Sequence, residues 1–360
     1  MAPFLLRRSE RGFKTAFLVD ILMSDSPVSH HNPSASSEPT PEPEATPQQQ
    51  KQMEAAYQQM KRQMAMKKIA ENIKHKIMVL SGKGGVGKST VATGLALSLA
   101  QQGLAVGLLD IDITGPNVPK MMGLEGQRLH VEDGRIHPNV GHSGVKVISM
   151  AFLLEDEDTP VVWRGPIKLG AIQQFIADVE WGILDHLIID FPPGTSDEPL
   201  TVAQSLPDID GIVIVTTPQD VALLDSRKSI SFAKTLNVPV LGVVENMSGY
   251  TVRGKAEAGS TIEVQGPGGK MVEAPVDTDG NWSATLDIFK SGGGKMTAES
   301  LQVPFLGALP FDPGVVRGGD DGVHRIVADP AGESAKAFAA VVESITGQLS
   351  EDDDVGVNII

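Results

Sequence analysis

The segment that decides the fold of this chain reads Ser81-Gly82-Lys83-Gly84-Gly85-Val86-Gly87-Lys88-Ser89-Thr90. An apolar run at 77–80 precedes it and predicts a buried strand, and the helical pattern over residues 91–102 follows it and ends at Gly103. A strand, a glycine-rich turn and a helix in this order form the setting in which backbone N–H groups bind a polyphosphate. The segment therefore predicts a phosphate-binding loop (P-loop) rather than a glycine-rich turn that matches by chance.

The residues of this loop have distinct expected roles. Lys88 is expected to contact the β- and γ-phosphates and to act in catalysis, and the Ser89 hydroxyl is expected to bind Mg²⁺. Thr90 is expected to support the phosphate on the opposite side, and the N-terminus of the new helix adds positive potential. The loop residues expected to bind nucleotide are Gly82, Lys83, Gly84, Gly85, Val86, Gly87, Lys88, Ser89 and Thr90.

The charge balance of the whole chain limits the classes of partner. The 360 residues include 30 Lys and Arg and 45 Asp and Glu, which gives a net charge of −15. This charge disfavours binding to nucleic acid and to anionic membranes. No apolar run approaches the roughly 20 residues needed to cross a bilayer, so we expect a cytoplasmic protein. The chain has no cysteine, which excludes disulfides and thiolate metal ligands from within it.

Apolar strand-like runs alternate with helical patterns after the loop. This alternation predicts an α/β P-loop NTPase fold, in which helices flank both faces of a mostly parallel sheet, with a small β-rich insertion. Ligands bind such sheets beyond the carboxyl ends of the strands. Besides 77–80, the predicted strands are residues 104–109, 145–149, 187–189, 211–215, 240–244 and 305–309.

Composition divides the chain into segments. The first is rich in Pro, Ser, Glu and Gln and predicts disorder, and Met23 is an alternative start to Met1. A helix follows, whose stripe of Met53, Tyr57, Met60 and Met64 we expect to pack on the domain rather than to bind a partner. We expect a disordered leader over 1–50 and an N-terminal helix over 51–75. The nucleotide-binding domain is expected over 76–349, with an insertion at about 251–290, and an acidic tail over 350–360.

Carboxylates follow two of the predicted strands. Asp112 is expected to orient the attacking water in catalysis, with Asp110 as a supporting switch residue, although Asp112 alternatively forms only the turn before Gly115. Asp190 ends the apolar run at 187–189 as in a Walker B element, and we expect it to bind Mg²⁺. The amide of Gly194, in the turn that follows, is expected to sense the γ-phosphate as part of a switch.

Residues after the last two predicted strands are expected to bind the adenine base. Asn246 has a side-chain amide that can pair with both the donor and the acceptor edge of adenine. Pro310 and Asp312 follow the last strand and are expected to close over the base. The order of these residues after the phosphate motifs is what makes them candidates.

The loop resembles that of one particular class of ATPase. Its second lysine, Lys83, is similar to the signature of the deviant Walker A class, which includes MinD, ParA and the nitrogenase iron protein. In that class the early lysine crosses a dimer interface to the partner's nucleotide. The resemblance therefore implies an ATP-bound homodimer in which Lys83 takes part in catalysis.

A longer series of motifs resembles the Mrp/ApbC family of P-loop ATPases. The resemblance covers about residues 73–349 and implies an ATP- and Mg²⁺-dependent ATPase. It further implies that the protein transfers iron–sulfur clusters to apoprotein clients, or that it works with assembly proteins to assist the maturation of those clients. The motifs are Ile73-Lys-His-Lys-Ile77, Asp110-Ile-Asp-Ile-Thr-Gly-Pro-Asn117, Trp163-Arg-Gly-Pro166, Ala171-Ile-Gln-Gln-Phe175, Asp190-Phe-Pro-Pro-Gly-Thr-Ser-Asp-Glu198, Thr216-Thr-Pro-Gln-Asp-Val-Ala-Leu-Leu-Asp225, Glu245-Asn-Met-Ser248 and Arg317-Gly-Gly-Asp-Asp-Gly322.

The chain departs from that family at the cluster site. Family members with the carrier motif follow Glu-Asn-Met-Ser with a Cys-x-x-Cys pair, and here the two positions are Val252 and Lys255. No iron–sulfur ligand is thus expected in this chain, and a cluster would need ligands from elsewhere. Residues 256–287 predict a small hairpin insertion, in which Trp282 either binds a partner or packs within the insertion itself.

A second class of function is a switch like MinD or ParA, which positions or regulates a protein partner according to the bound nucleotide. In such a switch an apolar helical stripe near the C-terminus would dock on a membrane. The residues around this stripe are acidic, which favours packing on the sheet instead. The stripe consists of Phe338, Val341, Val342, Ile345 and Leu349.

Overall fold

The structure, a computed structural model, describes residues 46–356 except 113, 114, 116, 154–164, 195, 207, 290 and 291. The chain divides into two compact units, residues 1–54 and 55–360, and the second contains the sheet. Most of the expected leader over 1–50 lies outside the described residues. Its last four residues belong to helix α2 (Pro47–Asn72), so this helix begins and ends earlier than the expected 51–75.

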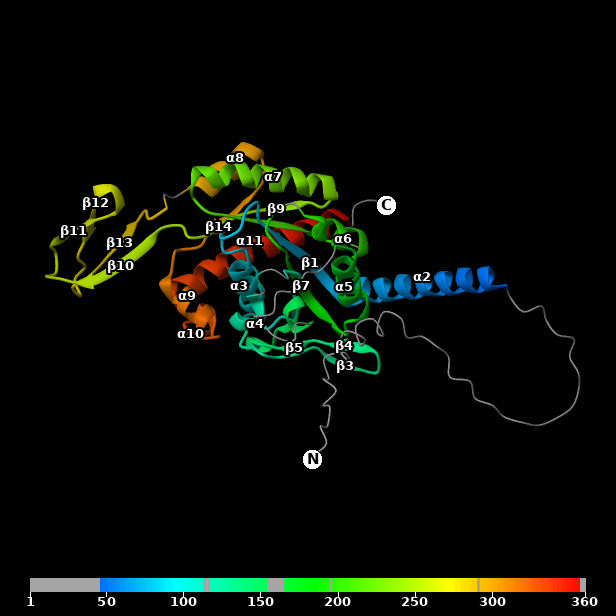
Figure 1. Cartoon of the computed structure of the whole chain (residues 1–360). Helices are drawn as coiled ribbons and strands as arrows, with labels where there is room; N and C mark the ends of the chain where they lie inside the picture. The colour runs from blue at the N-terminus through cyan, green and yellow to red at the C-terminus, as the bar shows by residue number, and fades with distance from the viewer. Residues whose placement is uncertain are drawn as a thin grey trace, which may run out of the picture. The chain divides into compact units, whose positions relative to one another are not determined.

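An eight-stranded sheet forms the centre of the second unit (Figure 1). All neighbouring strands are parallel except β5, which pairs antiparallel with β6. In spatial order the strands are β14 (Phe305–Ala308), β9 (Val240–Glu245), β8 (Gly211–Thr216), β1 (Ile73–Leu80), β7 (Leu184–Asp190), β2 (Val106–Asp110), β6 (Lys146–Ser149) and β5 (Asn139–Val140). The predicted α/β fold with a mostly parallel sheet is confirmed.

Helices cover both faces of this sheet, which explains why its central strands are apolar almost throughout. Every residue of β8 is buried, as are seven of the eight residues of β1. One face packs against α3 (Lys88–Gln101), α4 (Val118–Met121), α10 (Arg325–Ala328) and α11 (Glu333–Gly356). The other packs against α5 (Gly165–Asp178), α6 (Asp197–Ser205), α7 (Asp220–Leu236) and α8 (Gly293–Leu301).

The apolar stripe of α11 lies in the core. All five of its residues are at most 4% exposed, and the Phe338 ring lies so close to Gly94 of α3 that a Cβ there would approach it to 2.3 Å. The stripe therefore packs as expected and is not free to dock on a membrane. Helix α11 also continues through Gly356, so part of the expected tail over 350–360 is helical. Within the described part of the chain, no helix combines the length and apolarity required to cross a bilayer.

The stripe of helix α2 is solvent-exposed. Tyr57, Met60 and Met64 are 58%, 48% and 64% exposed, so the expectation that they pack on the domain is wrong. Among the α2 side chains that the structure describes, the first buried one is Ile69, at 7% exposure, and β1 begins only four residues later. The last turn of α2 is thus fixed by the core, whereas the side chains of Tyr57, Met60 and Met64 face solvent.

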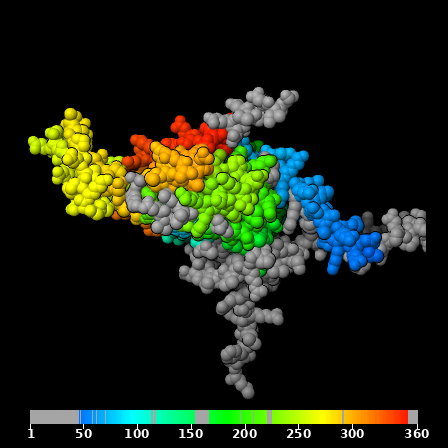
Figure 2. All heavy atoms as spheres, turned by 90° about the horizontal axis from the view of Figure 1, so that it is seen from above, coloured from blue at the N-terminus to red at the C-terminus, as the bar shows by residue number. Residues whose placement is uncertain are grey.

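The insertion consists of two antiparallel strand pairs. β10 (Tyr250–Lys255) pairs with β13 (Asn281–Leu286), and β11 (Thr261–Gln265) pairs with β12 (Met271–Pro275). Ala274, Ala284 and Leu286 are buried, and the Trp282 indole lies over Gly254, so the tryptophan packs within the insertion. In Figure 2 this lobe, in yellow, lies beside the orange and red C-terminal elements.

The remaining elements are short. The polar strands β3 (His130–Glu132) and β4 (Arg135–His137) form a hairpin that the sequence patterns did not predict. Helix α9 (Pro313–Asp320) follows β14 and contacts α4 and α10. Three 3₁₀ turns complete the described chain, at His142–Gly144, Met150–Leu153 and Pro267–Gly269.

Candidate functional site

The phosphate-binding loop lies between β1 and α3 and depends on close backbone approaches. Gly85 and Gly87 have φ angles of 77° and 78°, in the left-handed region that favours glycine. A Cβ at Gly82 would lie 2.3 Å from the carbonyl oxygen of Asp225 in α7, and a Cβ at Gly87 would lie 2.2 Å from Nδ2 of Asn246. Three of the loop's glycines are therefore required by geometry.

The topology brings Lys88 and Asp190 together. β1 and β7 are parallel neighbours with Val79 in register with Asp190, so the carboxylate lies at the strand edge where the loop begins. Lys88 Nζ lies 2.5 Å from Asp190 Oδ1 and 3.2 Å from Ser89 Oγ. Burial raises the pKa of Asp190 above its ordinary value, although the adjacent Lys88 ammonium acts in the opposite direction. The lysine and the carboxylate are 6% and 0% exposed, so the pair is removed from solvent.

The oxygens at this point suit a magnesium ion. Asp190 Oδ2 is buried and has no hydrogen-bond partner among the described residues. A buried carboxylate oxygen without a donor is costly unless something binds it. Together with the Ser89 hydroxyl nearby, it provides the hard oxygen ligands that Mg²⁺ prefers. The residues present therefore fit the ion.

Asp110 and Asp112 lie on the neighbouring strand end. Asp110 is in register with Asp190, accepts from Ser149 Oγ at 2.8 Å, and accepts from the backbone N–H of Asp112 at 3.0 Å. Burial, and after it the Asp190 carboxylate, raise the pKa of Asp110 well above its usual range. Asp112 accepts from the backbone N–H of Gly115 at 3.3 Å. Asp110 thus supports the position of Asp112, and Asp112 also forms the turn that the alternative interpretation described.

The remaining loop residues lie around this centre. The Gly194 N–H donates to the Ser81 carbonyl at 2.9 Å, which joins the turn after β7 to the start of the phosphate-binding loop. The Lys83 carbonyl accepts from Ser81 Oγ at 3.0 Å, and the Lys83 side chain is half-buried. In this structure the Gly194 amide therefore faces the loop backbone, so a role toward phosphate requires that this hydrogen bond opens.

A cavity of about 260 Å³ lies beside the phosphate-binding loop. The residues expected at the base, Asn246, Pro310 and Asp312, all line it together with Thr90 and the apolar side chains of Phe311 and Phe338. Backbone bonds join the two loops that form it, since the Leu309 N–H donates to the Glu245 carbonyl at 2.7 Å. The cavity is concave and mostly apolar with a few polar groups, which is typical of small-molecule and cofactor sites.

Two of these lining residues are already engaged. Asn246 Nδ2 donates to the Val86 carbonyl at 2.9 Å, which fixes the amide against the phosphate-binding loop. Asp312 is the N-cap of α9 and accepts from the Gly314 N–H at 2.7 Å, Arg325 Nε at 2.9 Å and Ser334 Oγ at 2.7 Å. Burial opposes ionisation of Asp312, but these donors outweigh it and hold its pKa below the ordinary value. An aspartate before Pro313 is a helix-start signal that would have predicted this capping role.

Two buried residues near the site were not predicted from the sequence. The carboxylate of Glu245, 1% exposed, accepts from the Gly292 N–H at 3.1 Å and the Gly294 N–H at 2.5 Å at the start of α8. His324, 1% exposed, accepts from the Ile326 N–H at 3.3 Å, and burial lowers its pKa to about 4. No local pattern marks the histidine, whereas Glu245 ends a buried strand and that position was a usable signal.

The positions of the missing cysteine pair lie in β10 of the insertion. Val252 is in register with Ala284 of β13, and Lys255 is in register with Asn281. Val252 is half-buried and Lys255 is exposed. Among the described residues, no group of three or more His, Cys, Asp or Glu side chains is placed to hold a metal ion.

Sequence comparison finds relatives over most of the chain. An iron–sulfur cluster carrier protein of Methanocaldococcus jannaschii is 45% identical over 286 residues, 78% of this chain and 89% of that protein. One from Saccharolobus solfataricus is 43% identical, covering 90% of this chain and 97% of that protein. A cytosolic Fe-S cluster assembly factor NUBP2 homolog of Dictyostelium discoideum is 43% identical, covering 78% and 97%.

Solved structures give the same fold. A nucleotide-binding protein from Archaeoglobus fulgidus, solved in complex with ADP, superimposes with a TM-score of 0.57 at 33% identity, over 76% of this chain and 96% of that one. The cell division ATPase MinD of Pyrococcus furiosus superimposes with a TM-score of 0.51 at 21% identity, over 76% and 99%, which supports the fold alone. Residues 72–275 and 276–346 match the description "ParA: NUBPL iron-transfer P-loop NTPase". The chain therefore belongs to this ParA/NUBPL family of P-loop NTPases, as its motifs indicated.

Proposed function

We propose that this protein binds and hydrolyses ATP as a homodimer and uses the nucleotide cycle in the maturation of iron–sulfur proteins. The observation that carries the proposal is the contact of Lys88 with Asp190 and Ser89 at the carboxyl edge of the sheet, beside the 260 Å³ cavity. The names of the relatives support the iron–sulfur role. The name of the Dictyostelium relative supports a cytoplasmic location.

Each residue has a part in the proposed reaction. The backbone N–H groups of residues 82–90 bind the phosphates, and the Lys88 ammonium compensates the charge on the transferring phosphoryl group. Asp112, held through its backbone by Asp110, orients the attacking water. Asp190 and Ser89 would hold Mg²⁺, which supplies additional positive charge at the phosphates when bound. Lys83 reaches the partner subunit's nucleotide, in keeping with its place in the loop.

The base would occupy the cavity between the Asn246 loop and the 309–312 loop. Asn246 has Oδ1 and one N–H left after its bond to Val86, which suffices to pair with an adenine edge. Asp312 acts there through the backbone it caps rather than as a free carboxylate. Pro310 covers the base from the side of the last strand.

The cluster is the cargo in this proposal, and the chain does not fit it as a thiolate carrier. The sequence has no cysteine, and thiolates are the usual ligands of iron–sulfur clusters. We therefore infer that the protein acts with apoprotein clients or assembly proteins that supply the ligands. Burial of the α11 stripe removes the support for membrane docking, whereas a nucleotide-dependent switch that regulates a protein partner stays an alternative prediction.

The proposal is tested by measuring phosphate release and bound iron and acid-labile sulfide on one anaerobically reconstituted sample. We expect ATP turnover that Lys88→Ala abolishes, and no iron or sulfide above a blank. Absence of turnover in the wild type would refute the ATPase assignment. A stably bound, transferable cluster would refute the inference that partners supply the ligands.

A further inference from the structure

The insertion is joined to the base cavity at both of its ends. β10 starts at Tyr250 and Phe289 follows β13, and both rings contact the Phe311 ring edge-on, with centroids 5.9 Å apart. The Phe311 N–H also donates to the carbonyl of Gly249, the residue before β10, at 2.8 Å. Phe311 lines the cavity, whereas Tyr250 and Phe289 do not. One wall of the cavity is thus supported from behind by the base of the insertion.

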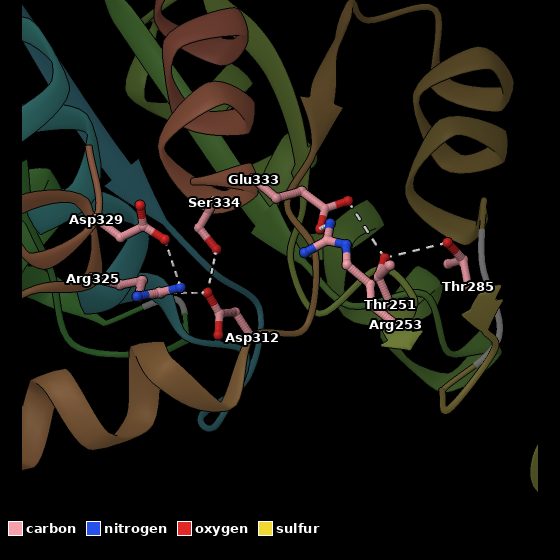
Figure 3. A network of polar contacts seen from close by, with 8 residues as sticks. All are labelled: Thr251, Arg253, Thr285, Asp312, Arg325, Asp329, Glu333 and Ser334. Atoms are coloured by element: carbon pink, nitrogen blue, oxygen red, sulfur yellow. Dashed lines mark hydrogen bonds and ion pairs between the residues drawn. The ribbon is translucent and has the colours of Figure 1, made fainter. Parts of the chain in front are cut away.

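A polar network joins the same two regions (Figure 3). Glu333, the first residue of α11, accepts from Thr251 Oγ1 at 3.4 Å and forms an ion pair with Arg253, both on β10. The next residue, Ser334, donates to Asp312 Oδ2 at 2.7 Å. Asp312 and Ser334 line the cavity. The start of α11 therefore contacts the insertion through one residue and the cavity through the following one.

We propose that the insertion is a positioning element for the base cavity: Tyr250 acts through Phe311, and Arg253 acts through Glu333 and Ser334 on Asp312. The proposal rests on the proposed function, since it takes the cavity to be the base site. Displacement of β10 by a partner would then change ATP affinity, and ATP would change the stability of β10 by the same coupling. The strand that replaces the cysteine motif would in this way connect partner binding to the nucleotide.

The chain provides variants that separate this role from simple packing. Tyr250→Ala removes the ring behind Phe311, whereas Tyr250→Phe keeps it. Arg253→Glu places two like charges together, and the double variant Arg253→Glu with Glu333→Arg restores an ion pair in the opposite sense. Lys270→Glu is the matched control, because Lys270 is in the same insertion but its ion-pair partner is Asp287, at 3.7 Å.

The experiment measures the Kd of a fluorescent ATP analogue together with kcat and KM for ATP. We expect Tyr250→Ala to raise Kd and KM about threefold to tenfold, the range for loss of an aromatic pair, with kcat unchanged. Arg253→Glu should raise them about twofold to fivefold, the range for an exposed ion pair, and the double variant should recover. Tyr250→Phe and Lys270→Glu should match the wild type.

Hydrogen exchange provides an independent readout that does not depend on any substitution. Bound nucleotide should slow amide exchange over β10 and the first turn of α11, but not over β11 and β12. Unchanged Kd in both Tyr250→Ala and Arg253→Glu, or unchanged exchange over β10, would overturn the inference while the wild type still binds ATP. Failure of the wild type to bind the analogue would instead refute the proposed function.

Discussion

A single methyl group in the phosphate-binding loop provides the sharpest test of the structure. In Gly82→Ala the new Cβ would lie 2.3 Å from the carbonyl oxygen of Asp225, 2.5 Å from its carbonyl carbon and 2.7 Å from its Cβ. Most of these atoms are backbone of α7, so neither side can yield by a rotamer change. The φ angle of Gly82 is not in the left-handed region, so the substitution tests the close approach alone.

The magnitude follows from the contact. Overpacking of this kind costs about 1–3 kcal/mol of unfolding free energy. With a urea dependence of about 3 kcal/mol per molar, a loss of about 2 kcal/mol lowers the unfolding midpoint by roughly 0.7 M. The assay is urea unfolding without nucleotide, followed by the fluorescence of tryptophans that include the buried Trp181, which is 3% exposed.

Gly84→Ala is the matched control in the same loop. Its Cβ would meet only Pro193 Cγ, at 3.8 Å, which is an ordinary contact. The control should be unchanged or up to about 1 kcal/mol more stable, because alanine restricts the unfolded chain. Equal midpoints for wild type and Gly82→Ala, or equal losses in both variants, would show that α7 does not lie against the loop as described.

Three further predictions concern buried ionisable side chains. Lys88→Ala should lower phosphate release by about 100-fold or more, since its charge acts on the transferring group; a rate near the wild-type one would contradict its role. His324 and His186 have folded pKa values of about 4 because burial disfavours their charged forms. Histidines in the unfolded chain have pKa values of about 6.5, so between pH 6.5 and 4 the unfolded chain binds more protons than the folded protein. As the pH is lowered through this window, the free energy of unfolding should therefore decrease by up to about 3 kcal/mol per histidine. The urea midpoint of His324→Gln should decrease less steeply than that of the wild type as the pH is lowered through this range. An equal pH dependence of the two midpoints would contradict the assignment of His324 as a buried neutral side chain. Glu245→Gln should lose about 1.5–3 kcal/mol, because the charged acceptor of two N–H groups at the start of α8 is weakened, and thermal unfolding would show it.

The central sheet and the phosphate site were predictable from the sequence because their signals are local. Short apolar runs, two of which end directly before Asp110 and Asp190, identify the strands that are buried on both faces. The contact of Lys88 with Asp190 follows once β1 and β7 are neighbours, but that adjacency is a property of the sheet order and cannot be obtained from spacing.

The errors arise where the outcome depends on distant residues. The α2 pattern is helical and amphipathic in sequence, yet Tyr57 and Met64 are exposed, because periodicity indicates a face but not what covers it. β3 and β4 are three-residue polar strands, too short for alternation to identify them. The engagement of Asp312 by Ser334 and Arg325 joins residues up to 22 positions apart and becomes visible only in three dimensions.

The strand register of β10 decides what two substitutions could achieve. Val252 and Lys255 are three residues apart in a continuous strand, so their side chains project from opposite faces and lie about 10 Å apart along it. Two sulfurs on one metal are less than about 5 Å apart. Two cysteines placed at these positions could thus not bind the same metal ion. Binding one ion through both sulfurs would require this part of the strand to become a turn. Cysteine substitutions at these two positions alone would therefore not create a chelating pair in β10.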